Sequence, residues 1–280
     1  MKLLSTFLLL ISCLTLSAQN FLGWQYKDRY FSASLGSGNN VFLGDFNQQK
    51  KIQEELSHFT LGLEARLWSK VGARVEASYY KIRGRDALAA DSSFYEQRNL
   101  SFESWNFEMS FQGVFYMREY AGDYHKRWPI DPYLALGVGF TTINPTTEYQ
   151  DEMIELRPLQ TEGVPYAPIT FMIPAAAGLK LRINEFVNFN MEIAYRYTFS
   201  DYLDDVSGTY PGERSNPLSN ALSNRKDEIA IVNQEVYDNL VPGERRGNPN
   251  NMDQYMFISL KLEIFLPPGK GPLFSKPGAY

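Results

Sequence analysis

Residues 59–79 decide the fold, and they read FTLGLEARLWSKVGARVEASY. Apolar side chains occupy every second position in 59–67 and again in 71–79. Alternation with a period of two indicates a strand whose two faces meet different surroundings. Because the second run begins directly after Ser69 and Lys70, the sequence predicts a β-hairpin with a tight turn.

The same alternation recurs along the rest of the chain. It is seen in 30–36, 105–115, 133–140, 173–182, 187–197 and 254–265. Asn184-Glu185 makes a second tight turn. Pro174 would remove a ladder hydrogen bond, so the strand around it is expected to start later or to carry a bulge. Eight strands are predicted in total.

The connections between these strands alternate in length. They are long at 37–57, 84–98, 144–168 and 200–252, short at 69–70 and 184–185, and of medium length at 118–131. Long and short connections therefore lie at opposite ends, as in outer-membrane barrels with short periplasmic turns and long external loops. The predicted fold is all-β, an eight-stranded antiparallel transmembrane outer-membrane β-barrel with long extracellular loops.

The N-terminal segment reads as a secretory signal cut near Ala18. Leu10 to Cys13 offers a lipoprotein cleavage box as the alternative. After Ala18 no apolar run approaches the ~20 residues of a membrane-spanning helix, so any span must consist of strands. The expected organisation is a signal peptide at 1–19, a barrel at 20–266 and a Pro/Gly-rich periplasmic tail at 267–280, located in the cell outer membrane.

Composition and face polarity separate a membrane barrel from a soluble one. Aromatic residues make up 15% of the chain, and the net charge of -5 argues against a nucleic-acid partner. Two girdles are expected, with Trp68, Tyr116, Tyr133, Phe186 and Phe265 at the short turns and Tyr79, Trp105, Phe140, Tyr197 and Tyr255 at the long loops. A lipocalin-like barrel with its apolar face inward is the alternative.

If the apolar face points to lipid, the charged face must fill the lumen. The expected lumen residues are Glu64, Arg66, Arg74, Glu76, Glu108, Lys180, Arg182, Glu192 and Arg196. Eight strands enclose only enough space for side chains or one small ligand, and unpaired buried charges are costly. The sequence therefore predicts a paired network that plugs the barrel.

Catalytic chemistry has little support in the sequence. Only His58 and His125 are present, and the common metal, phosphate and nucleophile motifs are missing. An outer-leaflet enzyme would use His58 with Ser57 and Asp45, whereas the simpler interpretation is a solvated loop histidine. The sequence predicts no catalytic residues and no cofactor, and residues 36–40 (GSGNN) are interpreted as a turn.

An acidic run follows the 187–197 strand. Asp201, Asp204 and Asp205 are predicted to form a structural cluster at the barrel rim, paired with Arg98 or Arg196. A Ca²⁺ site is the alternative, although the run lacks an EF-hand pattern. Farther along, Leu218, Ala221, Leu222, Ile229 and Val232 have partial helical spacing, which predicts a short amphipathic helix.

Four segments together resemble a known family. They are RNLSF at 98–102, Pro132-Tyr133 with Gly137 to Gly139, LRPLQTEG at 156–163 and YRYTFSDYLDDVSGTY at 195–210. In this order they resemble the PorG-like outer-membrane barrels of the Bacteroidetes type IX secretion system. The resemblance covers most of residues 30–210. It implies a non-enzymatic subunit that anchors or organises the periplasmic ring of PorK and PorN, known as GldK and GldN in gliding relatives.

A periplasmic partner would meet the short turns and the tail. The medium turn contains Tyr124, Arg127 and Trp128, residue types enriched at interface hot spots, and the tail adds Phe274 and Tyr280. These five residues are the predicted partner-binding set, with a disordered end and a lipid-headgroup anchor as the alternative. The competing function is a stand-alone outer-membrane barrel that binds lipid or a small ligand, or an outer-leaflet enzyme.

Overall fold

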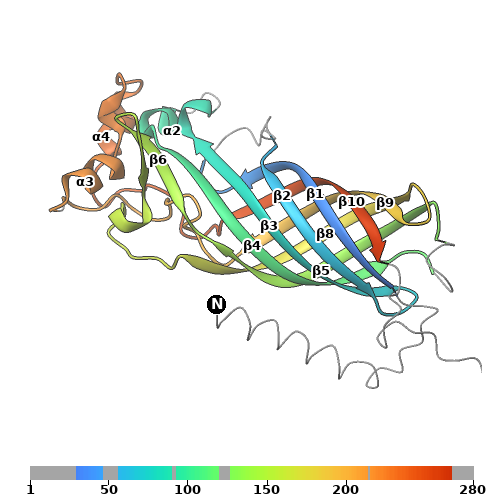
Figure 1. Ribbon diagram of the computed structural model, residues 1–280. Helices are drawn as coiled ribbons and strands as arrows, with labels where there is room; N and C mark the ends of the chain where they lie inside the picture. Colours follow the sequence, from blue (N-terminus) through green and yellow to red (C-terminus); the bar gives the residue numbers. More distant parts are fainter. Residues whose placement is uncertain (1–29, 47–55, 90–92, 120–126, 214, 267–280) are drawn as a thin grey trace, which may run out of the picture.

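The computed structural model describes residues 30–46, 56–89, 93–119, 127–213 and 215–266 (Figure 1). The strands are β1 (Tyr30–Leu43), β2 (His58–Arg66), β3 (Val71–Arg85), β4 (Ser101–Tyr116), β5 (Ile130–Thr142), β6 (Pro145–Tyr149), β7 (Glu152–Glu155), β8 (Ile169–Arg182), β9 (Val187–Thr198) and β10 (Gln254–Leu266). The helices are η2 (Asp86–Leu88), α2 (Ser93–Arg98), η4 (Arg157–Leu159), α3 (Pro217–Ser223), η5 (Lys226–Glu228) and α4 (Gln234–Asn239). The predicted signal peptide and tail lie outside the described residues.

Eight of these strands close into an antiparallel barrel. Their order is β3-β2-β1-β10-β9-β8-β5-β4, and pairing of β3 with β4 completes the circle. The first and last strands pair from Phe31 with Leu266 to Leu43 with Gln254. The predicted eight-stranded barrel is therefore confirmed. The additional hairpin β6–β7, in which β6 pairs with the end of β4, was not predicted.

The wall of the barrel has its apolar side chains outside. β4 alternates buried and exposed residues along its whole length, because successive side chains of a strand point to opposite faces. The exposed large apolar side chains of the wall include Phe59, Leu61, Leu63, Val75, Phe107, Met109, Phe111, Leu134, Leu136, Val138, Phe171, Met191, Ile193, Leu260, Leu262 and Ile264. The predicted lipocalin-like alternative, with these residues inside, is wrong.

The aromatic girdles are thinner than the sequence predicted. Tyr116, Tyr133, Tyr255 and Phe265 are buried inside the barrel. They stand at the alternate strand positions whose side chains point inward, and this position determines where an aromatic ring lies. Of the predicted girdle residues, Trp68 and Phe186 are exposed near the short turns and Tyr79, Trp105 and Tyr197 near the long loops, while Phe140 is half-buried.

Residues 36–40 form part of β1 and do not form the predicted turn. Gly36 and Gly38 point inward, and a Cβ at Gly38 would lie 1.9 Å from the Ile258 carbonyl oxygen and 2.9 Å from the His58 ring. A Cβ at Gly36 would lie 2.5 Å from Lys261 Cγ. These glycines thus leave interior space for larger side chains on neighbouring strands.

Pro174 interrupts one ladder without shifting it. β8 begins at Ile169, before the predicted start, and pairs with β5 both at Ala175–Leu136 and at Met172–Gly139 in the same register. The two intervening pairs are absent from the ladder, as expected where proline supplies no N–H. The predicted later start or bulge is therefore wrong.

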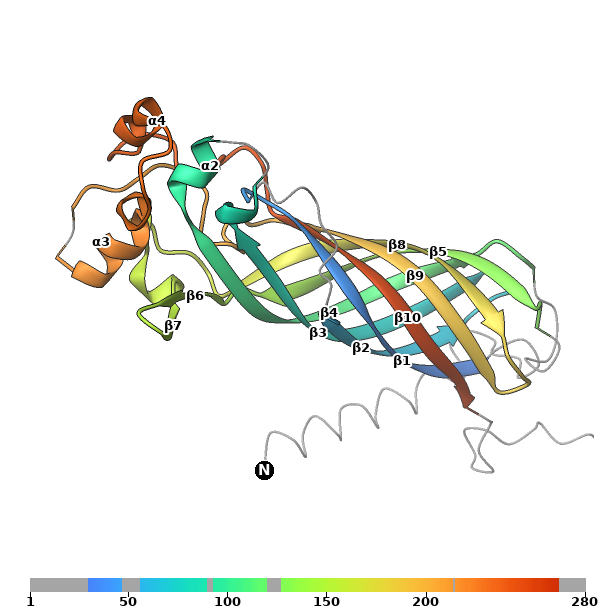
Figure 2. The same cartoon turned by 90° about the horizontal axis from the view of Figure 1, so that it is seen from above.

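The long connections fold into a cap over one end of the barrel. We use "cap" for the described parts of 44–57, 86–100, 143–168 and 199–253, which gather with α2, α3, α4 and β6 at the end opposite the short turns (Figures 1 and 2). α3 contains Leu218, Ala221 and Leu222, as predicted, whereas Ile229 and Val232 lie outside α-helices. No described helix is both long and apolar enough to cross a membrane.

Candidate functional site

The middle of the barrel interior holds a ring of paired charges. Arg74 Nη1 donates to Glu192 Oε2 at 2.6 Å, and Lys261 Nζ donates to Glu192 Oε1 at 2.8 Å and to Glu76 Oε2 at 2.5 Å. The Tyr133 hydroxyl donates to Glu192 at 2.7 Å. The five side chains come from inward positions on four strands, β3, β5, β9 and β10, so this ring ties distant parts of the wall together.

A second layer lies toward the short turns. Lys180 Nζ contacts Glu64 at 2.5 Å and Glu263 at 2.8 Å, and the Tyr116 hydroxyl donates to Glu64. Arg66 lies 3.4 Å from Asp131 and rests on the Tyr116 ring, with 3.8 Å between its guanidinium carbon and the ring centroid. Buried charges of this kind are tolerated where partners satisfy them.

A third layer lies toward the cap. Arg196 Nη2 donates to Glu108 Oε1 at 2.9 Å, and the Tyr255 hydroxyl donates to Glu108 Oε2 at 2.7 Å. Beyond it, an apolar cluster closes the lumen, in which Phe46 and Leu203 of the cap pack with Tyr80, Phe102 and Phe257 of the barrel strands. The interior is filled by paired side chains, as predicted.

The lumen assignments are correct with one exception. The predicted set apart from Arg182 is buried in the interior, and Lys261 and Glu263 join it from β10. Arg182 is exposed because it stands at the end of β8, beyond the mouth of the barrel, where its Nη1 donates to the Arg127 carbonyl at 3.0 Å.

The predicted rim cluster is not held together by the expected ion pairs. Arg98 forms a two-pronged pair with Asp86, with both N···O distances 2.7 Å, and donates to the carbonyls of Arg246 and Asp45 at 2.7 and 3.1 Å. Arg196 points into the lumen, toward Glu108. The predicted pairs with the three aspartates are wrong, because Arg98 pairs with Asp86 of its own loop and Arg196 reaches across the lumen to Glu108 of β4.

Asp204 and Asp205 have different partners. Asp204 accepts from the backbone N–H of Asp45 at 3.2 Å and of Val206 at 2.9 Å. Asp205 accepts from the Tyr166 hydroxyl at 2.6 Å and from Thr161, and lies 3.8 Å from Arg246. Among the described residues no group of three His, Cys, Asp or Glu side chains is arranged to hold a metal ion.

Burial changes the ionisation of these aspartates. Burial raises the pKa of Asp201 to about 7, and the neighbouring Asp45 and Glu162 carboxylates act in the same direction. Burial raises the pKa of Asp205 to about 6, although Arg246 opposes the shift. The pKa of Asp204 is also raised well above its usual range, by burial and then by Asp45. The folded cap therefore favours the protonated forms.

These shifts predict that the cap loses stability as pH rises. Unfolded aspartates ionise near pH 4, whereas Asp201 in the fold retains its proton up to about pH 7, so the unfolded state binds fewer protons in this window. We expect the free energy of opening the cap to fall by on the order of 1–3 kcal/mol between pH 5 and 8. The rate of limited proteolysis of the cap, compared between pH 5 and 8, measures this change in opening free energy.

The matched variant is Asp201→Asn, which cannot ionise. It should flatten this pH dependence, whereas Asp151→Asn, on the exposed β6–β7 turn, should leave it unchanged. If the cap of Asp201→Asn lost stability with rising pH more steeply than the wild-type cap, ionisation of Asp201 would not be the cause of the pH dependence.

Three cap residues that organise the rim were missed at the sequence level. Asp86 pairs with Arg98, and Arg246 Nη1 donates to Glu162 Oε1 at 2.9 Å and to the Asp205 carbonyl at 2.5 Å. Glu162 also accepts from the backbone N–H groups of Ser207 and Gly208. Asp86 stands 12 residues before Arg98 in the same loop, and this short separation could have indicated their ion pair. The sequence around Arg246 has no comparable feature.

The predicted partner-binding residues are separated by the structure. Arg127 is buried: it donates to the carbonyls of Glu185 and Asn184 at 2.8 and 3.0 Å and lies 3.8 Å from the centroid of the Phe265 ring. It closes the short-turn end of the lumen. Trp128 is 49% exposed, with its indole N–H bonded to the Glu119 carbonyl at 2.9 Å. Tyr124, Phe274 and Tyr280 lie outside the described residues.

His58 is a buried interior residue, and the prediction of a solvated loop histidine is wrong. Its Nδ1 and Nε2 lie 2.8 Å from Asn40 Oδ1 and Ser259 Oγ, and its ring stacks on Phe257 at 4.3 Å. Both ring nitrogens are engaged by residues other than Ser57 and Asp45. This geometry does not support the catalytic arrangement that was the alternative.

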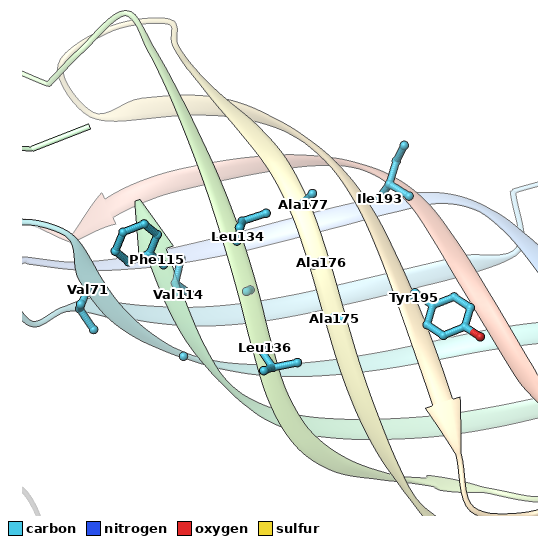
Figure 3. Close-up of a pocket in the computed structure, with 12 residues that line it drawn as sticks. Val71, Val114, Phe115, Leu134, Leu136, Ala175, Ala176, Ala177, Ile193 and Tyr195 are labelled. Atoms are coloured by element: carbon cyan, nitrogen blue, oxygen red, sulfur yellow. The ribbon is translucent and has the colours of Figure 1, made fainter. Parts of the chain in front are cut away.

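The outer wall carries an apolar hollow of about 750 Å³ (Figure 3). Its floor is low because Ala175, Ala176 and Ala177 follow one another on β8, and Leu134, Leu136, Phe115 and Ile193 are among the larger side chains around it. The hollow offers contact to hydrocarbon and almost no polar group.

Comparison with known proteins gives one family and a set of distant folds. A family model described as a domain of unknown function, DUF6089, matches residues 3–226. No curated protein matches the chain.

Several solved structures are similar in fold. The crystal structure of Neisserial surface protein A has 8% sequence identity and a TM-score of 0.39, covering 84% of this chain and 96% of that one. The Ail protein of Yersinia pestis has 11% identity and a TM-score of 0.39, covering 86% and 99%. The outer membrane enzyme PagL has 13% identity and a TM-score of 0.32, covering 83% and 98%. These likenesses concern the fold alone.

Proposed function

The chain belongs to the DUF6089 family, and since that description assigns no function, we propose from its residues that it is a plugged outer-membrane barrel that anchors or organises a protein secretion machine. The observation that carries the membrane part is the inverted polarity of the wall. Large apolar side chains cover the outside, while paired charges fill the inside. Water would oppose this arrangement and hydrocarbon favours it.

The filled interior supports a structural role over transport. Three layers of ion pairs occupy the lumen, Arg127 lies buried at one end and the apolar cluster shared by the cap and the barrel strands closes the other. A solute would have to displace buried charges from their partners, each at a cost of several kcal/mol. A barrel of this kind contributes through its surfaces.

The resemblance to PorG-like barrels supplies the partner in this proposal. It implies a periplasmic ring of PorK and PorN type, which would meet the short-turn end, where β1 begins and β10 ends. Trp128 is the described residue of the predicted contact set that is exposed at this end. Arg127 is left out of the contact set, since its hydrogen bonds hold the barrel mouth.

Substitution of the exposed turn should separate assembly from docking. We expect Trp128→Ala and Tyr124→Ala together to reduce copurification of the ring proteins at least about tenfold, the loss of one modest hot spot. Affinity purification from outer membranes with mass spectrometry measures it, and truncation after Pro267 tests the tail in the same assay.

The control for this experiment is Trp105→Ala, an exposed tryptophan of β4 near the long loops, at the opposite end of the barrel. Both proteins should fractionate with the outer membrane and remain heat-modifiable. If the turn variant and the tail truncation both retain the ring, docking is elsewhere. If the wild type is soluble in the periplasm, the membrane proposal itself fails.

A further inference from the structure

A column of cations stands on the outer wall directly beyond one aromatic girdle. β3 places Tyr79, Lys81, Arg83 and Arg85 at successive outward positions, while Tyr80, Ile82 and Gly84 between them are buried. Successive outward residues of a strand are about 7 Å apart, so the three cations span roughly 13 Å along β3. A lipid headgroup layer is roughly 5–8 Å thick, so the column reaches across it.

The girdle fixes the height of this column. The Tyr79 ring stacks on Trp105 of β4, with centroids 5.0 Å apart and planes at 15°, and Lys81 Nζ lies 5.4 Å from the centre of the Trp105 ring. Tyrosine and tryptophan mark the boundary between hydrocarbon and headgroups. Lys81, Arg83 and Arg85 therefore begin where headgroups begin.

The charge of the column is only partly neutralised. Glu103 lies opposite Arg83 in the β3–β4 ladder and pairs with Lys81 Nζ at 2.5 Å, while Arg83 and Arg85 form no ion pair among the described residues. Where the other described barrel strands extend past the girdle, their outward positions carry no cation; examples are Thr142, Ile169 and Gln254. Among the described barrel strands, the outward cations beyond the girdle therefore lie on β3.

We propose that Lys81, Arg83 and Arg85 form a binding site for the phosphate groups of an outer-leaflet lipid headgroup, with the acyl chains lying along the apolar wall below. Guanidinium groups match phosphate geometry with paired hydrogen bonds. Long basic side chains reach from an apolar wall to the headgroup layer without burying their charge. The site rests on the proposed function only in requiring that the barrel cross a membrane.

The test uses the full chain in bilayer nanodiscs that contain phosphatidylcholine and a minor fraction of bis-phosphorylated lipid A. Native mass spectrometry of the released barrel measures how much lipid A it retains relative to phosphatidylcholine. Each basic residue near an anionic lipid surface contributes about fivefold in binding. Arg83→Gln with Arg85→Gln should therefore reduce lipid A retention about 25-fold.

The control variant, Arg157→Gln with Arg245→Gln, makes the same charge change within the cap and should retain lipid A like the wild type. Dephosphorylated lipid A should be retained no better than phosphatidylcholine. Equal retention of both lipids, or an equal loss in the control variant, would overturn the site. Competition by millimolar inorganic phosphate with no dependence on acyl chains would reassign it to free phosphate.

Insertion is scored separately in the same samples. Heat-modifiable migration and a β-type circular dichroism spectrum show that the barrel has crossed the bilayer. An inserted barrel without phosphate preference contradicts only the headgroup site, whereas failure to insert contradicts the membrane proposal and the site with it.

Discussion

Glu192→Ala is expected to destabilise the barrel by about 3–5 kcal/mol. Glu192 accepts from Arg74, Lys261 and Tyr133 at 2.6, 2.8 and 2.7 Å, in the middle of a closed lumen. Its removal leaves two buried cations, which share only Glu76 as a remaining carboxylate. Urea unfolding in lipid vesicles, followed by tryptophan fluorescence, measures the loss.

The matched control is Glu119→Ala, which removes an exposed carboxylate 3.3 Å from Lys70. Exposed pairs contribute about 0–1 kcal/mol, so this variant should unfold close to the wild type. Glu192→Gln keeps the side-chain volume and one acceptor, and it should fall between the two. Equal stability of the alanine variants at 192 and 119 would show that the interior is hydrated.

Arg98→Ala is expected to loosen the cap and leave the barrel closed. Arg98 is fully buried and joins three connections: Asp86 of its own loop, the Asp45 carbonyl after β1 and the Arg246 carbonyl before β10. Without it Asp86 is a buried, unpaired carboxylate, and about 3–5 kcal/mol of cap stability is lost. Proteolysis should then cut the cap while heat-modifiable migration persists.

A second variant distinguishes lost charge balance from lost packing. Arg98→Met with Asp86→Asn removes both charges and fills the space of the arginine side chain. In the wild type the Leu100 N–H donates to Asp86 Oδ2 at 3.0 Å, and the asparagine keeps an oxygen that can accept this bond. We expect it to recover part of the protease resistance. An Arg98→Ala cap as resistant as the wild type would mean that the apolar cluster alone holds the loops.

The barrel could be predicted because alternation is a local property of the chain. Whether Phe107 or Glu108 points outward depends on the strand phase, and one buried face fixes the register of every neighbour. The aromatic girdle was predicted wrongly where a residue was placed by its type and not by its position in the strand alternation. Tyr116 and Tyr133 were assigned to a girdle as aromatic rings, yet their positions face the lumen, where their hydroxyls bond Glu64 and Glu192.

The details of the sites depend on long-range contacts that no local pattern encodes. The glycines of β1 resembled a turn, but they make room for His58 and Lys261 from strands on either side. Arg98 finds Asp86, and Arg246 finds Glu162, only after the loops have folded together. Arg127 resembled an interface residue, and it became part of the barrel mouth because Asn184, Glu185 and Phe265 surround it.

The pairing of β1 with β10 also constrains how the protein is made. The seam that closes the wall joins the first strand to the last, from Phe31–Leu266 to Leu43–Gln254, so closure cannot begin before the final strand has been synthesised. Contacts this far apart in sequence make folding slow, and an unclosed intermediate exposes its apolar outer face to water. All the connections that form the cap are therefore synthesised before the wall can close.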